Sequence, residues 1–280
     1  MQLLNFNGEN IDKELLQPFL SNRAFYYGDG FFETIKIING KMFLPEKHFA
    51  RINKAMKVLK FKFKNGQNFQ TLETEINQLI AVNNIHQGGR LRITFFRDGS
   101  GFYAPENNEM CFLIEVNETT NGFELNRKGL NVEVYNELKK SQNILSGFKS
   151  INSSVYVLAG VFQKERGLDD ALILNEEGNI IESTKSNLFI VSDGKFYTPS
   201  LDQGCISGVM REFILEKSNQ FGIKVYECIL SVDDLINASE IFFTNAINGI
   251  VWVGGFRNKR YYNNYTKDLM KKLQSESKNI

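Results

Sequence analysis

The sequence has 280 residues, of which 42% are hydrophobic, and it carries 33 Lys and Arg against 32 Asp and Glu. This length and this apolar content suit about two globular domains with packed cores. A formal net charge of +1 supplies no large field of one sign, so nucleic acid and anionic membranes are disfavoured as partners and small molecules are favoured.

Cysteine and histidine usage excludes further classes of protein. The three cysteines, Cys111, Cys205 and Cys228, show no paired spacing, which argues against disulfides or zinc and suits a reducing compartment. Only His48 and His86 are available for a histidine metal centre or a Ser-His-Asp triad. Neither a signal-like N-terminus nor an apolar run of about 18 residues is present. We therefore expect no metal, no membrane segment and a cytoplasmic location.

The first part of the chain predicts a small N-terminal α/β domain over residues 1–116. Two Asn-Gly pairs, at 7–8 and 39–40, are hairpin signals, and the second follows a β-branched and aromatic run. Along that strand, Glu33 and Thr34 must point to opposite faces, so at most one of them faces any given pocket. Pro45 suits the first turn of a helix. A further helix is expected over 69–82, with strands over 90–97 and 110–116.

Two arginines in this domain have a functional and an ordinary interpretation. Arg51 lies three residues after His48 on one helical face, where its guanidinium could clamp a phosphate or could be a solvated charge. Arg97, at a strand end beside a glycine loop, could bind a substrate carboxylate or could be an edge-strand charge. Spacing alone favours the ordinary interpretation of both.

Polar, turn-rich residues 117–128 are the predicted interdomain linker, followed by a larger C-terminal domain over 129–280. This second half mixes strands and helices, so the fold class is α+β. The expected strands cover 131–135, 170–174, 187–191, 196–198, 225–227 and 240–245, and the expected helices 153–167, 208–221 and 264–273.

Three features of the second half suit the binding of pyridoxal phosphate. Lys149 follows an apolar Phe, Glu182 lies at the end of an apolar strand, and Gly208 lies at the start of a helix. A partly buried amine can form a Schiff base with an aldehyde, a carboxylate can keep a pyridine nitrogen protonated, and a helix N-terminus can bind phosphate. Most lysines and turn-flanking acids are surface charges, so neither residue alone indicates a cofactor site. The hypothesis of a pyridoxal phosphate site depends on all three features occurring together.

The sequence resembles the fold-type IV, or class IV, pyridoxal phosphate enzymes over nearly its whole length. The motifs that carry the resemblance are Tyr27-Gly28-Asp29-Gly30-Phe31-Phe32-Glu33, His48-Phe49-Ala50-Arg51, Lys149 with Asn152, and Glu182 followed by Asn187-Leu188-Phe189. The resemblance implies a two-domain fold with a barrel-like C-terminal domain and a homodimer whose sites include residues of the partner's small domain.

The resemblance also implies roles for individual residues. Lys149 would attach the cofactor, Glu182 would pair with the pyridine nitrogen, and Arg51 would bind the phosphate. Backbone contacts to the phosphate would come from Val209, Met210, Asn245 and Ala246. We expect a small-molecule amino substrate.

Within the family, the sequence is most similar to 4-amino-4-deoxychorismate lyases, which make 4-aminobenzoate for folate synthesis. The similarity lies in Leu201-Asp202-Gln203 through Gly208-Val209-Met210-Arg211, in Thr244-Asn245-Ala246, and in Thr34, which would assist catalysis. Glu33 is more typical of aminotransferases, and Asn248-Gly249-Ile250 replaces a proline-bearing run expected in the lyase. The branched-chain enzymes' Gly-Thr-Ala run is absent.

Two alternatives follow. A branched-chain or D-amino acid aminotransferase needs a cationic group for the substrate's α-carboxylate, and Arg97 is the candidate. A non-catalytic protein that has retained the fold is the second alternative, although intact Lys149 and Glu182 argue against it.

Overall fold

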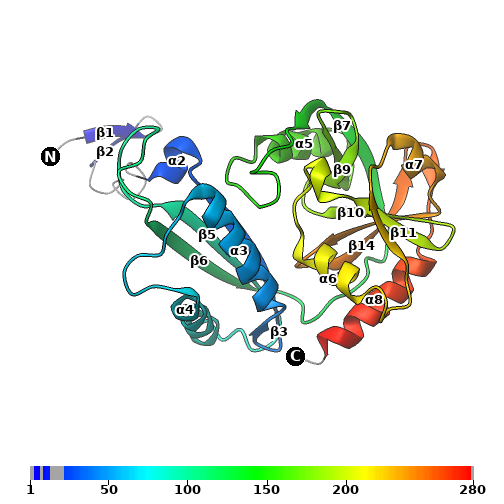
Figure 1. The fold of residues 1–280 in the computed structure, drawn as a ribbon, viewed down its shortest axis with the longest axis horizontal. Coiled ribbons are helices and arrows are strands. Elements are labelled where there is room, and N and C mark those ends of the chain that lie inside the picture. The colour runs from blue at the N-terminus through cyan, green and yellow to red at the C-terminus, as the bar shows by residue number, and fades with distance from the viewer. Residues whose placement is uncertain (1–2, 7–8, 13–21, 279–280) are drawn as a thin grey trace.

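The computed structural model describes residues 3–6, 9–12 and 22–278 of the chain. A helix-covered sheet built from the first half lies beside a larger strand assembly built from the second half (Figure 1). A separate two-stranded hairpin, β1 (Leu3–Phe6) with β2 (Glu9–Asp12), confirms the first hairpin prediction.

The first sheet has the strand order β4-β3-β5-β6 and is antiparallel. Its apolar face packs against two helices, which contribute Ile52 and Ile76 to one core with Ile35 and Leu91. Leu44 takes a left-handed backbone before Pro45, which opens the first of these helices. The elements are α2 (Arg23–Tyr27), β3 (Gly30–Ile38), β4 (Lys41–Met42), α3 (Pro45–Leu59), α4 (Phe69–Val82), β5 (Gly89–Arg97) and β6 (Met110–Glu118).

The second half forms a closed barrel, which confirms the expected fold-type IV architecture. Six strands follow one another around it in the order β10-β13-β14-β7-β8-β9, and the register pair Asn187 with Glu182 joins β9 back to β10. The strands of the sheet are β7 (Leu130–Lys140), β8 (Asp170–Asn175), β9 (Ile180–Ser183), β10 (Asn187–Ser192), β11 (Lys195–Pro199), β12 (Val225–Cys228), β13 (Glu240–Asn245), β14 (Gly249–Phe256) and β15 (Lys259–Arg260).

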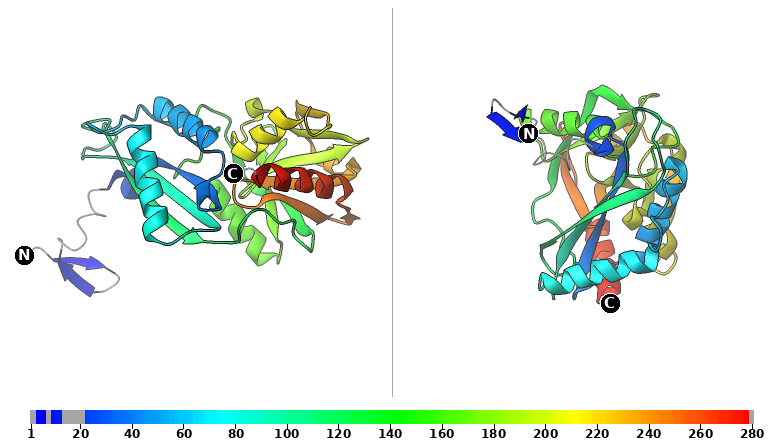
Figure 2. Two further views of the ribbon diagram at one scale, coloured as in Figure 1. Left: turned by 90° about the horizontal axis from the view of Figure 1, so that it is seen from below. Right: turned by 90° about the vertical axis from the view of Figure 1, so that its left-hand side faces the viewer.

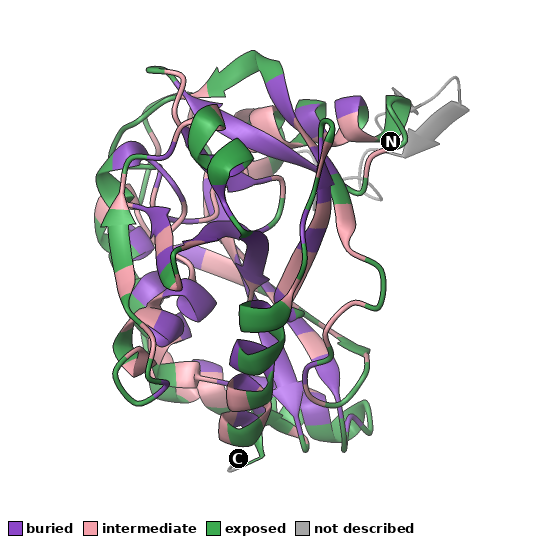
Figure 3. Ribbon diagram, turned by 90° about the vertical axis from the view of Figure 1, so that its right-hand side faces the viewer, coloured by how far each residue is buried: buried purple, intermediate pink, exposed green. Residues whose placement is uncertain are grey.

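Helices cover the barrel, and the longest of them, at the C-terminus, runs along it (Figure 2). The buried residues follow the strands, whereas outward helix faces and loops are exposed (Figure 3). The helices are α5 (Ser154–Glu165), η1 (Leu201–Gln203), α6 (Val209–Lys217), α7 (Val232–Asn237) and α8 (Asn264–Ser277).

The helix predictions are confirmed in position and differ in extent. The helix over 69–82 has its predicted bounds. The last helix continues to Ser277, because Leu273 and Ser277 are both buried against the barrel. The helix expected over 208–221 ends at Lys217, where a turn that brings the amide of Phe221 to the Lys217 carbonyl takes over.

The two sheets share apolar packing. Ile38 and Phe43, from the β3–β4 hairpin, lie in the same core as Phe213 of α6. The Phe43 ring meets the Phe123 ring edge-on at 5.1 Å between centroids. Within residues 3–6, 9–12 and 22–278, no cluster of three His, Cys, Asp or Glu could hold a metal, and no helix is long and apolar enough to cross a membrane.

Candidate active site

The segment that carries Lys149 is held against strand β3. The Phe32 amide donates to the Lys149 carbonyl at 2.8 Å, and the Ile151 amide donates to the Gly30 carbonyl at 3.1 Å. The Ser207 amide donates to the Gly147 carbonyl at 2.9 Å, which ties the same segment to the loop before α6. Lys149 is therefore fixed at the junction of the small sheet and the barrel.

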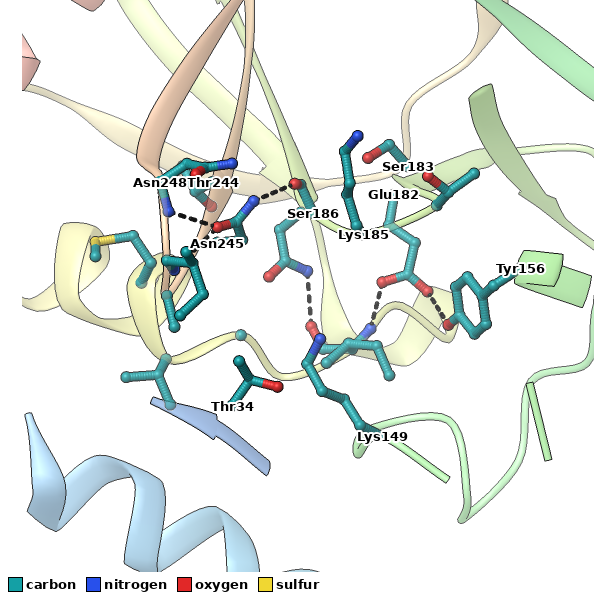
Figure 4. Close-up of a pocket in the computed structure, with 18 of the residues that line it drawn as sticks. Thr34, Lys149, Tyr156, Glu182, Ser183, Lys185, Ser186, Thr244, Asn245 and Asn248 are labelled. Carbon is teal, nitrogen blue, oxygen red and sulfur yellow. Dashed lines mark hydrogen bonds between the residues drawn. The ribbon is translucent and has the colours of Figure 1, made fainter. Parts of the chain in front are cut away.

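A cavity of about 430 Å³ lies at this junction. Eight of the nine site residues predicted from the sequence line it, namely Thr34, Arg51, Lys149, Glu182, Val209, Met210, Asn245 and Ala246. In Figure 4 the Thr34 hydroxyl is turned toward Lys149, while Ser186 and Asn245 occupy the opposite wall. Thr34 faces this cavity and Glu33 does not line it, as strand alternation predicts.

The amine of Lys149 is poised for nucleophilic chemistry. Burial, followed by the positive charge of Arg51, lowers the pKa of Lys149 from 10.5 to about 8. In the described part of the chain its Nζ makes no hydrogen bond, and it lies 5.5 Å from the centre of the Phe32 ring. An amine with this pKa is partly neutral near pH 7 and can attack an aldehyde.

Glu182 is a buried carboxylate that retains one unused acceptor position. Its Oε1 accepts from Lys140 Nζ and from the Tyr156 hydroxyl, both at 2.7 Å, and its Oε2 accepts from the Ile206 amide at 2.9 Å. An ionised carboxylate offers about four acceptor positions. The position left on Oε2 suits a ring N–H donor.

The far wall of the cavity offers donors to an anion. The Thr244 hydroxyl is buried and lacks a hydrogen-bond partner among the described residues. Val209 and Met210 begin α6, and the first amides of a helix have no carbonyl partner within it. A Cβ at Gly208 would lie 1.8 Å from Asn187 Oδ1, so only glycine allows this close approach.

Arg51 is held by a buried acidic partner. Its Nε donates to Glu33 Oε2 at 3.0 Å, its Nη2 donates to Glu33 Oε1, and its Nη1 donates to the Ser207 carbonyl at 2.9 Å. The His48 Nδ1 lies 2.9 Å from the same carboxylate. Burial alone raises the pKa of Glu33, but Arg51 and His48 outweigh it and lower the pKa. Arg51 is thus oriented at the cavity with part of its donor set already used.

The structure places Arg97 away from the cavity, which corrects the expectation that it meets a substrate carboxylate. Its Nε, Nη1 and Nη2 donate to Asp29 at 2.8 Å, to Asn108 at 2.6 Å and to the Leu59 carbonyl at 2.8 Å. Its guanidinium lies 4.4 Å from the centre of the Phe61 ring. Arg97 is therefore a buried structural residue.

Sequence reasoning missed four residues that help to build the site. Thr244 adjoins the predicted Asn245 and could have been found from that neighbour. Tyr156 and Lys140 meet Glu182 only through tertiary packing, so no sequence spacing indicates them. Arg90 and Leu91 point to opposite faces of the sheet along β5, and Arg90 lines the cavity. The sequence does not indicate which of the two faces borders the cavity.

These features fit pyridoxal phosphate. The chain supplies an amine with a lowered pKa, a carboxylate with one free acceptor position, and a wall with an unpaired hydroxyl and helix amides. Lys149 would hold the aldehyde, Glu182 the ring nitrogen, and the wall around Thr244 the phosphate.

Comparisons with known proteins agree with this chemistry. The family model described as amino-transferase class IV matches residues 30–254. The aminodeoxychorismate lyase of Bacillus subtilis is 27% identical over 260 residues, covering 89% of this chain and 85% of that protein. The D-alanine aminotransferase of Bacillus licheniformis is 22% identical over 281 residues, covering 98% and 95%.

Similarity to solved structures extends over the same length. The branched-chain aminotransferase of Thermoproteus uzoniensis has a TM-score of 0.82 at 19% identity, covering 97% of this chain and 92% of that chain, which shows a common fold. This chain therefore belongs to the class IV aminotransferase family of pyridoxal phosphate-dependent enzymes.

Proposed function

We propose that this enzyme is a 4-amino-4-deoxychorismate lyase, which releases pyruvate and forms 4-aminobenzoate for folate synthesis. The observation that carries the proposal is the Thr34 hydroxyl. It lies on the cavity wall turned toward Lys149, and it makes no hydrogen bond within the described residues. A free hydroxyl beside the base suits proton delivery to a leaving group. The similarity to the Bacillus subtilis lyase supports the same choice.

The residues of this chain divide the reaction between two proton transfers. Bound pyridoxal phosphate supplies an electron sink. Lys149, once displaced by the substrate amine, takes the proton from the carbon that bears this amine. The C–O bond at the neighbouring carbon then breaks, and Thr34 delivers a proton to the departing oxygen. Lys149 passes its proton back to the Thr34 hydroxyl, so one proton moves in net from carbon to oxygen. The three-carbon unit leaves as the enol, which tautomerises to pyruvate.

The remaining predicted residues have binding roles in this proposal. Glu182 holds the ring nitrogen, whereas Arg51 and the backbone at Val209, Met210, Asn245 and Ala246 hold the phosphate. The Asn245 side chain already accepts from the Ile247 and Asn248 amides at 3.0 and 2.8 Å, so it shapes the turn that presents Ala246.

The second candidate function is a class IV aminotransferase for branched-chain or D-amino acids, favoured by the similarity to the Bacillus licheniformis enzyme. Glu33 does not separate the two candidates, because its carboxylate binds Arg51 outside the cavity. A protein that keeps the fold without catalysis is disfavoured by the presence of Lys149 and Glu182 in one cavity.

The deciding experiment measures pyruvate release from aminodeoxychorismate by wild type and by Thr34→Val. We expect release by wild type and a loss of about 10²-fold or more in the variant, which is the usual contribution of a proton-transfer residue. Cofactor absorbance should be retained in both. Thr94→Val is the matched control, because Thr94 lies on the same sheet face without lining the cavity. Conversion of the cofactor by a panel of L- and D-amino acids, without pyruvate release, would establish the aminotransferase instead.

We also propose a homodimer. Helix α5 exposes Val157, Leu158 and Val161, which are 59%, 46% and 47% exposed, and the loop after β5 exposes Phe102 and Tyr103. Exposed apolar side chains that lie together on one helix, as on α5, are typical of an interface. Light scattering should give twice the chain mass, and Val161→Asp should shift the protein toward the monomer.

A further inference from the structure

The face of the small sheet that is turned away from α3 and α4 carries three cations, Lys36, Arg90 and Arg92. Helices α3 and α4 cover the face that holds Ile35 and Leu91, and the opposite face holds Thr34, Arg90 and Arg92. Thr34 pairs directly with Arg92 across β3 and β5, so Arg90, two residues along β5, is a diagonal neighbour of Thr34. Diagonal neighbours in an antiparallel sheet lie about 7–8 Å apart.

Of these three cations, Arg90 lines the cavity. It is half-buried, and its guanidinium makes no hydrogen bond or ion pair with any described residue. A partly desolvated guanidinium without a partner is unfavourable, and a carboxylate is the ligand that its fork of donors fits best.

Arg92 is engaged behind the cavity wall and adds to the positive potential there. Its guanidinium lies 3.9 Å from the centre of the Phe32 ring, and its Nε donates to the Thr94 hydroxyl at 3.3 Å. Burial and the charge of Arg90 lower the pKa of Arg92, so the two arginines repel each other. An anion bound at Arg90 relieves this repulsion.

The two walls of the cavity therefore present separate anion sites. The barrel wall, with the Thr244 hydroxyl and the first amides of α6, suits the cofactor phosphate. The sheet wall, with Thr34 and Arg90, is left for the substrate. A monocarboxylate with an apolar side chain would leave the charge of Arg90 without a partner.

We propose that Arg90 is a specificity residue that binds a second carboxylate of the substrate, so that the enzyme selects amines carrying two carboxylates. This inference rests on the proposed function, in which the departing three-carbon unit bears its own carboxylate next to the oxygen that Thr34 protonates. Thr34 and Arg90 are diagonal neighbours on one wall of the cavity, where a proton donor and a carboxylate ligand for one leaving group must both lie.

The test uses two unreactive probes and the holoenzyme. We would measure by calorimetry the binding of 3-(carboxymethoxy)benzoate, a ring acid with an ether-linked second carboxylate, and of 3-methoxybenzoate, which lacks that carboxylate. Wild type should bind the dicarboxylate at least tenfold more tightly. Arg90→Met should abolish this preference while changing the affinity for 3-methoxybenzoate less than twofold, and Arg90→Lys should restore part of the preference.

Arg127→Met is the control for general charge, because Arg127 is exposed and outside the cavity. It should keep the preference, and all variants should keep the cofactor absorbance. The inference is overturned if wild type shows no preference or if Arg90→Met retains it. Because the probes do not react, a dicarboxylate preference without pyruvate release would reject the lyase proposal alone. Pyruvate release with an unchanged preference in Arg90→Met would reject the role of Arg90 alone.

Discussion

Lys140 Nζ and the Tyr156 hydroxyl both donate to Glu182 Oε1 at 2.7 Å, so a lysine from the end of β7 neutralises the buried carboxylate behind the cavity. Lys140 also donates to the Ser146 carbonyl at 3.1 Å and is itself 10% exposed. The carboxylate is thus paired with a buried cation and fixed in position by two side chains.

Replacing Lys140 by Met should leave Glu182 without its counter-ion. Removing one partner of a buried ion pair typically costs about 3–5 kcal/mol, so we expect the melting temperature of the apoprotein to fall by several degrees and cofactor affinity to weaken. Lys140→Arg should recover much of both. Lys139→Met is the control, because Lys139 donates to the exposed Glu176 carbonyl at 3.2 Å. Equal losses in the two methionine variants would contradict a specific role for Lys140.

The lowered pKa of Lys149 sets a pH dependence for cofactor attachment. With a pKa of about 8, about one amine in ten is neutral at pH 7, against about one in 2500 for an ordinary lysine of pKa 10.4. The rate at which the apoprotein gains its visible colour with pyridoxal phosphate should therefore rise with pH and level off above about 8. An inflection near 10, as for the model amine Nα-acetyl-lysine, would disprove the shift.

The same pKa has a consequence for stability. Between pH 8 and about 10.4 the unfolded chain binds a proton at Lys149 that the folded chain lacks. Raising the pH through this window therefore favours the folded state. Denaturant titrations at pH 8 and pH 10 should show a smaller gain for Lys149→Met than for wild type.

Thr244 and Thr198 form a matched pair of buried hydroxyls. Thr244 has no partner among residues 22–278, whereas the Thr198 hydroxyl donates to the Leu188 carbonyl at 2.7 Å. Thr244→Val should leave the apoprotein as stable as wild type or more so, and should weaken cofactor binding severalfold. Thr198→Val should cost about 1 kcal/mol of stability and leave cofactor affinity unchanged. A loss of stability in Thr244→Val without a loss of cofactor affinity would show that the Thr244 hydroxyl does not bind the cofactor.

Gly208→Ala should distort the part of the cavity that would hold the cofactor phosphate. The new methyl would overlap Asn187 Oδ1 and push the start of α6 away from β10. We expect cofactor affinity to fall at least tenfold. In Gly160→Ala the added methyl meets nothing within 4 Å on helix α5, and the variant should gain about 0.5–1 kcal/mol of stability. Normal cofactor binding by Gly208→Ala would refute the steric argument.

Local sequence patterns predicted the positions of the helices and strands well. The alternation of a strand and the helix start at Pro45 depend only on residues that are close together in the sequence. The same reasoning correctly separated Glu33 from Thr34. For Arg97 the spacing favoured an edge-strand charge, whereas the structure buries it on an inner strand. A strand-end arginine gives no sign that Asp29, Asn108 and Leu59 will bind its donors. Sequence reasoning could not find Lys140 or Tyr156, because their meeting with Glu182 depends on barrel closure between β9 and β10.

Strand β3 has one further property of note. Its Ile35 and Ile37 belong to the core beneath α3 and α4, while Ile38, at its end, belongs to the core beneath α6 and α8. A rigid-body rotation of the small sheet away from the barrel would have to pull Ile38 and Phe43 out of that second core. The sheet and the barrel are therefore mechanically coupled, and heat or denaturant should melt both in a single cooperative step.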